Sequence, residues 1–230
     1  MRAPALLGFL AVALAGPAVA AAQGVVVDQG RFAVTLGGRS AGTEEFTIRR
    51  AGLEGAAAIF ANATVTLTGG ADAQQIQPLL RALPPDGIAT QYQVRVTGPG
   101  SMDLRLRLAQ RRYVAAIQSS VGEEQREFPA DPDTRVLEVD VAHHYYFLRD
   151  LREGSTAPVI EPRIRGHVIL TVGPATEEEL RVGQTVVAAR RVEYSAGDDR
   201  RIVWFDRIGR VLRVEIPGRT YLAERIDLLR

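Results

Sequence analysis

The sequence contains no cysteine and no lysine, so each of its 28 basic residues other than histidine is an arginine. Without cysteine the chain can form no disulfide and carries no residue for lipoprotein acylation. Without lysine, Schiff-base catalysis and the phosphate-binding lysine of a P-loop are both impossible. The exclusive use of arginine is typical of a GC-rich bacterial genome.

The chain also lacks an excess of either charge. Its formal net charge is +1, and removal of Arg2 with the N-terminal segment described next balances basic against acidic residues. Proteins that bind nucleic acid usually carry a strong basic excess. The composition therefore predicts no nucleic-acid partner.

The first 22 residues have the pattern of a signal peptide. Arg2 supplies a positive start, and residues 6–15 are apolar. The small residues of Ala18-Val-Ala20 or Ala20-Ala-Ala22 offer a cleavage site after residue 20 or 22. The apolar run is shorter than the ~20 residues that a membrane-spanning helix needs. We predict a signal peptide over 1–22, a single domain over 23–230, no membrane span, and a periplasmic or secreted bacterial protein.

Alternating apolar and polar residues dominate the rest of the chain. Residues 92–96 and 102–108 alternate on either side of the turn at Gly98–Gly100, and residues 211–216 alternate in the same way. A period of two is the signature of half-buried antiparallel strands. These segments predict a series of β-hairpins.

Three segments suggest other structures. Residues 141–151 have apolar residues at helical spacing, which predicts an amphipathic helix. Residues 176–179 match a helix capping box. Residues 73–83 also have helical spacing, but Pro78 interrupts it and favours a short turn or an irregular extended segment.

Together these patterns predict a mainly β protein of about ten or eleven strands, too many for a flat sheet. We expect a curved antiparallel sheet that forms an open or incomplete barrel, with one short helix on its concave side. A two-sheet β-sandwich is the alternative.

No pattern identifies a catalytic residue, a metal site or a cofactor. Gly38–Gly42 matches the nucleophile elbow around Ser40, but the following segment alternates like a strand, so the glycines fit a hairpin turn better. Adjacent His143 and His144 point in different directions on a helix and cannot readily share a metal, and His167 lies far along the chain. The acidic pairs fall in turns or at the expected helix start.

The apolar strand faces are the remaining candidate for a binding site. They either line a cavity for a small apolar ligand or form an ordinary core. The residues expected to contact a ligand come from one hairpin, the central helix and a late strand: Met102, Leu104, Leu106, His144, Tyr145, Leu148 and Trp204.

Three stretches of the chain carry a family resemblance: Gly30–Gly42, Ala142–Leu148 and Ile202–Pro217. With them the sequence resembles uncharacterised bacterial secreted proteins grouped with the periplasmic lipoprotein-carrier fold, the LolA/LolB-like open barrels. The resemblance implies a curved antiparallel sheet and no catalytic residue. The absence of cysteine departs from the membrane-anchored members.

The sequence thus favours a non-catalytic periplasmic carrier of an amphipathic molecule, such as a lipid or an acyl chain, in envelope biogenesis. One alternative is a secreted hydrolase that uses Ser40 or a histidine–carboxylate site. A second alternative is an interaction module of an envelope assembly, which would expose a large apolar patch.

Overall fold

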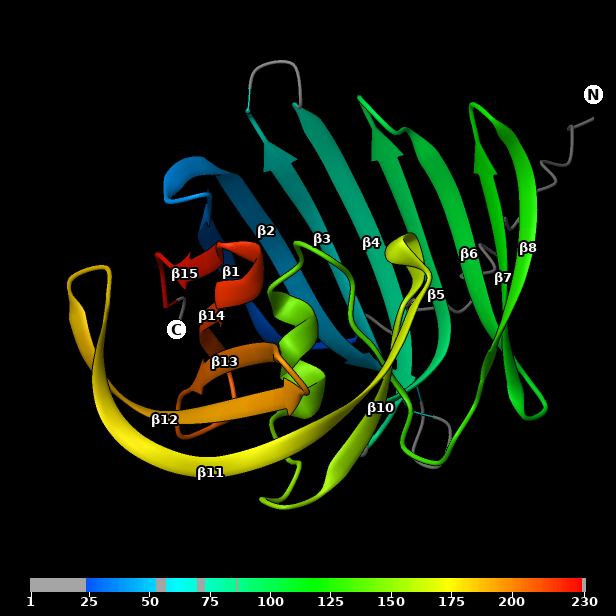
Figure 1. Ribbon diagram of the computed structural model, residues 1–230. Coiled ribbons are helices and arrows are strands. Elements are labelled where there is room, and N and C mark those ends of the chain that lie inside the picture. The colour runs from blue at the N-terminus through cyan, green and yellow to red at the C-terminus, as the bar shows by residue number, and fades with distance from the viewer. Residues whose placement is uncertain (1–23, 53–56, 70–72, 86, 229–230) are drawn as a thin grey trace, which may run out of the picture.

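The computed structural model describes residues 24–52, 57–69, 73–85 and 87–228. Within them, one sheet of 15 strands runs in the order β8-β7-β6-β5-β4-β3-β2-β1-β15-β14-β13-β12-β11-β10-β9. The sheet curls but does not close, because its edge strands β8 and β9 are not hydrogen-bonded to each other (Figure 1). The predicted open antiparallel barrel is confirmed, and the sandwich alternative is not formed.

The first half of the sheet is a meander in which each strand pairs with the next along the chain. Its strands are β1 (Val25–Leu36), β2 (Arg39–Ala51), β3 (Ala58–Leu67), β4 (Gln74–Leu83), β5 (Ile88–Thr97), β6 (Met102–Ala109), β7 (Arg112–Ser119) and β8 (Gly122–Pro129). The β1–β2 turn uses Gly37 and Gly38 at φ 57° and 73°, the left-handed conformation that a tight hairpin requires.

The second half returns to β1 through the C-terminal strand. It contains β9 (Arg135–Val136), η2 (His143–Leu148), β10 (Thr156–Glu161), η3 (Pro162–Ile164), β11 (Gly166–Val182), β12 (Thr185–Ala196), β13 (Asp199–Phe205), β14 (Val211–Ile216), η4 (Pro217–Arg219) and β15 (Tyr221–Arg225). The three η elements are short 3₁₀ helices. No helix in the described segments is long and apolar enough to cross a membrane.

Two expectations about local structure were wrong, and both segments are strands. Residues 74–83 form β4 despite Pro78, because the paired register between β3 and β4 is interrupted beside the proline, where an amide hydrogen is not required. Residues 176–179 belong to β11, where Glu177 lies opposite Arg190 of β12. Pairing of β11 with β12 over residues 175–182 outweighs the capping-box pattern here.

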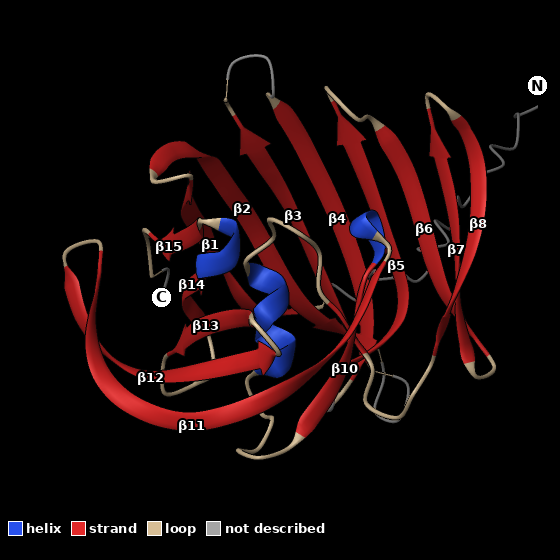
Figure 2. Ribbon diagram, viewed as in Figure 1, coloured by secondary structure: helices blue, strands red, loops and turns tan. Residues whose placement is uncertain are grey.

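The predicted helix over residues 141–151 is shorter than expected and is not amphipathic. It is the 3₁₀ helix η2, and all six of its residues are buried. η2 lies inside the curve of the sheet (Figure 2). The Nδ1 atoms of His143 and His144 have polar contacts inside the protein, whereas their Nε2 atoms are buried with no hydrogen-bond partner among the described residues.

Two apolar clusters lie on opposite faces of the sheet. The large cluster fills the concave side and includes the apolar residues of η2. The small one lies on the outer face, since its Ile202 and Trp204 alternate along β13 with Val203 and Phe205 of the large cluster.

A buried ion pair joins the beginning and the end of the domain. Arg225 of β15 donates two hydrogen bonds to Asp28 of β1, at 3.0 and 2.8 Å, and both side chains are almost fully buried. The paired geometry satisfies two charges that would otherwise be costly to bury.

Candidate functional site

Glu44 of β2 anchors the N-terminal end of η2 inside the sheet. Its carboxylate accepts hydrogen bonds from the backbone N–H groups of Ala142 and His143, at 2.6 and 2.9 Å. The Nδ1 atom of His143 lies 2.6 Å from the same carboxylate. The side chains of Glu44 and His143 are both 0% exposed. The carboxylate therefore satisfies donors that no other group of the helix could reach.

Glu138, just before η2, organises a second buried polar group. It accepts hydrogen bonds from the hydroxyl of Tyr92 at 2.6 Å and from Nε of Arg163 at 3.0 Å. Burial raises the pKa of Glu138, while Arg163 acts in the opposite direction. The backbone N–H of Glu138 donates to Nδ1 of His144 at 3.1 Å. That contact assigns the proton of the neutral His144 ring to Nε2.

The two adjacent histidines pack against each other within the core. Their ring centroids are 4.6 Å apart with an interplanar angle of 72°. Burial and the neighbouring His143 lower the pKa of His144 well below its usual value, so the ring stays neutral. No group of three or more histidine, cysteine, aspartate or glutamate residues is placed to hold a metal ion in the segments that the structure describes.

Glu44 and His143 form a histidine–carboxylate pair, but the pair is enclosed. A catalytic base must reach its substrate within hydrogen-bond distance, and both side chains here are shielded from solvent. The pair therefore positions η2 and is not a candidate catalytic centre in this conformation.

An open hollow lies beside the C-terminal end of η2, and we call it the η2 hollow. Its volume is about 330 Å³. Three arginines and two carboxylates share its lining with apolar side chains: Arg135, Arg149, Arg152, Asp133, Asp150, Pro85, Phe147 and Leu151. The hollow therefore offers apolar contact beside a cluster of charges in which arginines outnumber carboxylates by three to two.

The arginines of the η2 hollow differ in how far their charges are already paired. Arg149 stacks on the ring of Tyr146 at 3.8 Å and forms an ion pair with Asp150 at 2.9 Å. Arg135 donates to the carbonyl of Phe147 at 3.2 Å, which helps to satisfy the end of η2. Arg152 is exposed, and its guanidinium has no partner among the described residues. Arg152 is thus the group most available to an anion.

The structure brings together most of the side chains expected to contact a ligand. Leu104, Leu106, His144, Tyr145 and Leu148 all lie in the concave core and are at most 3% exposed. They form packed core in this conformation and do not line an open cavity.

The other two predicted ligand contacts lie apart from this group. Met102 is half-buried at the margin of the same core. Trp204 belongs to the outer cluster, where the guanidinium of Arg213 lies 4.9 Å from its ring centroid. Trp204 is therefore not brought together with η2.

Ser40 and His167 do not form part of a catalytic arrangement. Ser40 is exposed at the start of β2, opposite Thr35 in the β1–β2 hairpin, so the predicted hairpin turn is confirmed. His167 is exposed on β11, whereas His143 and His144 are fully buried. No hydrogen bond joins Ser40 to a histidine in the described part of the chain.

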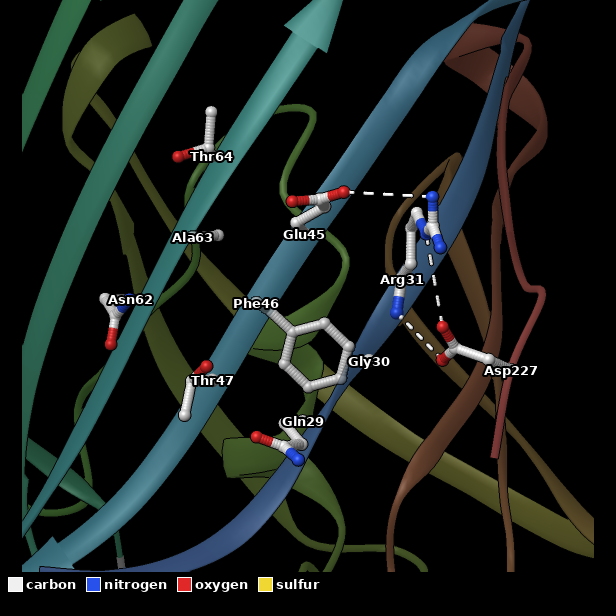
Figure 3. A pocket seen from close by; sticks show the side chains of 10 residues that line it. All are labelled: Gln29, Gly30, Arg31, Glu45, Phe46, Thr47, Asn62, Ala63, Thr64 and Asp227. Carbon is white, nitrogen blue, oxygen red and sulfur yellow. Dashed lines mark hydrogen bonds and ion pairs between the residues drawn. The ribbon is translucent and has the colours of Figure 1, made fainter. Parts of the chain in front are cut away.

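A second hollow, of about 410 Å³, crosses the outer face of β1, β2 and β3 (Figure 3). Arg31 forms ion pairs with Glu45 and Asp227 at 3.8 and 4.0 Å. Asn62 and Thr64 line the opposite side of the hollow in Figure 3. One guanidinium faces two carboxylates, so this hollow favours no anionic ligand.

Comparison with known proteins adds two similar solved structures. No protein-family model matches the chain, and no curated protein matches its sequence. A β-barrel-like protein of domain of unknown function DUF1849 from Brucella abortus is similar with a TM-score of 0.49 and 9% identity, covering 89% of this chain and 96% of that one. A DUF1089 family protein from Pseudomonas aeruginosa has a TM-score of 0.42 and 15% identity, covering 76% and 90%. Neither similarity carries a function, and the likeness to lipoprotein carriers stays a prediction.

Glu44, whose carboxylate holds the start of η2, and Glu138, whose backbone N–H contacts His144, were not among the residues predicted from the sequence. A signal for Glu44 was present, because residues 44, 46 and 48 lie on the same face of one strand. Glu44 must therefore face the core together with Phe46 and Ile48. Glu138 stands between Leu137 and Val139 and gives no comparable signal, since residues 137–142 form neither a strand nor a helix.

Proposed function

We propose that the protein is a non-catalytic binding protein for an amphipathic molecule with an acidic head group, and that the η2 hollow is where the molecule docks. The observation that carries the proposal is the lining of this hollow, in which Phe147 and Leu151 adjoin Arg149 and Arg152. The enclosure of the histidine–carboxylate pair supports binding in preference to catalysis.

The chemistry of the hollow fits the two ends of such a ligand. Arginine pairs well with carboxylate and phosphate groups because its planar fork presents parallel N–H donors. A volume of about 330 Å³ lies at the lower end of the range for small-molecule sites, ~300–1,000 Å³. Burial of ~100 Å² of apolar ligand surface there contributes about 2.5 kcal/mol. Leu148 and Tyr145, predicted as ligand contacts, belong to the same helix as Phe147 but do not line the hollow.

Titration of the purified protein with a fluorescent fatty acid tests this site. We expect saturable binding that weakens several-fold in Leu151→Gln, which places a polar group in the apolar wall, and in Arg152→Gln, which removes the available charge. Val121→Gln is the matched control, because Val121 is 95% exposed in the β7–β8 turn. Equal affinity in all three variants and the wild type would remove the η2 hollow as the binding site.

The same proposal places the protein in the periplasm or outside the bacterial cell. Its support is the signal-peptide pattern of residues 1–22, which lie outside the residues that the structure describes. The intact mass of the protein recovered from the periplasmic fraction of a bacterial host should correspond to cleavage after residue 20 or 22. Recovery of only the uncleaved chain from the cytoplasm would contradict this location.

A further inference from the structure

The outer face of β5–β8 carries a hollow that is distinct from the η2 hollow. Its volume is about 410 Å³, and its lining includes Gln91, Gln93, Arg105, Arg107, Ala116 and Gln125. Leu104 and Leu106 belong to the concave core, so the alternating Arg105 and Arg107 point to the other face of β6. We call this the arginine–glutamine hollow.

The strand register brings its polar side chains into one surface. Gln91 lies opposite Arg107 and Gln93 lies opposite Arg105 on β5 and β6. On the other side, Arg105 lies opposite Ala116 of β7, which lies opposite Gln125 of β8. The small Ala116 leaves the depression between two rows of longer side chains.

The two central arginines have no partner of their own. Among the described residues, neither guanidinium takes part in a hydrogen bond or an ion pair. Other arginines on this face are already paired: Arg95 with Asp103 at 2.9 Å, and Arg112 with Glu127 at 2.5 Å. Arg105 also lines an adjoining hollow that holds Asp103, Glu123 and Glu124. These carboxylates contact Arg95, Gln118, Arg126 and Arg165, and no ion pair joins them to Arg105 or Arg107 among the described residues.

We propose that the arginine–glutamine hollow binds a negatively charged sugar. Two unpaired guanidinium groups suit a carboxylate, sulfate or phosphate group, which arginine recognises through paired N–H donors. The glutamine amides offer donors and acceptors together, which match the hydroxyl groups of a sugar ring. Val114 and Ala116 give the floor an apolar surface for the C–H face of the ring. This site is independent of the proposed binding at η2.

Calorimetric titration with four tetrasaccharides tests the inference: one bearing carboxylates, one sulfates, one phosphates, and their neutral parent. At least one charged tetrasaccharide should bind and the neutral parent should not. Adding the corresponding charged monosaccharide as a competitor separates a single acidic sugar from a polymer as the natural source. Whether or not the monosaccharide displaces the bound tetrasaccharide, binding of the tetrasaccharide must also depend on Arg105 and Arg107.

Two double variants with the same change in charge identify the site. R105Q/R107Q should weaken binding by about tenfold or more, the loss expected for charge-assisted hydrogen bonds. R95Q/R112Q, which alters paired arginines on the same face, should bind nearly as well as the wild type. The inference is overturned if no charged tetrasaccharide binds, if both double variants lose affinity equally, or if a single-stranded DNA of similar charge binds as tightly.

Discussion

At the scale of single residues, the account depends on buried polar groups that satisfy one another. Glu44 is the clearest case, because one carboxylate receives two backbone N–H groups and the ring of His143. Removing such a group leaves several buried donors without an acceptor, which costs more than the loss of a surface contact.

We expect Glu44→Ala to lower the free energy of unfolding by about 3 kcal/mol or more, since it removes a buried charged partner. Glu44→Gln should cost less, because its amide oxygen keeps part of the hydrogen bonding. Urea denaturation measures both. Glu45→Ala is the control on the neighbouring outward position, where the side chain is 68% exposed, and it should change stability by less than ~0.5 kcal/mol. A Glu44→Ala variant as stable as Glu45→Ala would refute the anchoring role.

His144 gives the protein a predicted dependence on pH. Its folded pKa lies well below the unfolded value of 6.5, so below pH 6.5 the unfolded state binds more protons than the folded state. The stabilising contribution is full above that pH and is lost as the pH falls toward the folded pKa, by at most ~1.4 kcal/mol per pH unit. His144→Asn keeps an acceptor for the Glu138 N–H and should flatten this slope, as measured by denaturation between pH 7 and 5. His167→Asn, at an exposed position, should leave the slope unchanged. If the slope in His144→Asn equals that of the wild type, the pH dependence does not come from His144.

At the scale of elements, close approach between strands restricts what a position tolerates. A Cβ atom on Gly42 would lie 1.9 Å from the carbonyl oxygen of Thr66 on β3, and the residue has φ 156°. We expect Gly42→Ala to cost about 2 kcal/mol or more, the range for overpacking against rigid surroundings.

Gly38→Ala is the control for that change. Gly38 also has a positive φ, of 73°, but nothing lies within 4 Å of its added Cβ. The control measures backbone strain alone, at ~1 kcal/mol. Thermal or urea unfolding that ranks the two variants equally would show that the approach of β2 to β3 is not rigid.

Sequence patterns predicted strands well where one face of the strand is buried and the other is exposed to solvent. The β5–β6 hairpin and the strands at the C-terminus follow this rule, because the period of two directly reports the two faces. The rule fails where both sides of an element are covered, as in η2, all six residues of which are buried. It also fails for β4 and β11, where pairing with neighbouring strands outweighs a proline and a capping-box pattern.

The lining of the η2 hollow holds none of the residues predicted as ligand contacts. Tyr145 and Leu148 belong to η2, but burial of these side chains is decided by the curl of the whole sheet. Trp204 was placed with them because alternation alone does not say which face of a curved sheet is concave. The η2 hollow combines Pro85 with residues from two further stretches, 133–135 and 147–156, which no local pattern brings together.

At the scale of the whole molecule, the sheet forms a barrel-like scaffold whose two edges remain unpaired with each other. An exposed ion pair of 2.6 Å joins Glu124 of the edge strand β8 to Arg165, which lies between η3 and β11. The concave side is filled by η2 and the large apolar cluster, and the η2 hollow lies at the C-terminal end of that helix.

The central claim is that this scaffold carries an amphipathic ligand, and native mass spectrometry of the full protein purified from a bacterial periplasm tests it most directly. We predict an added mass that organic extraction releases as a lipid or fatty acid, with less of it on Leu151→Gln than on Val121→Gln. A spectrum of bare protein alone, together with no binding of added fatty acid, would contradict the account.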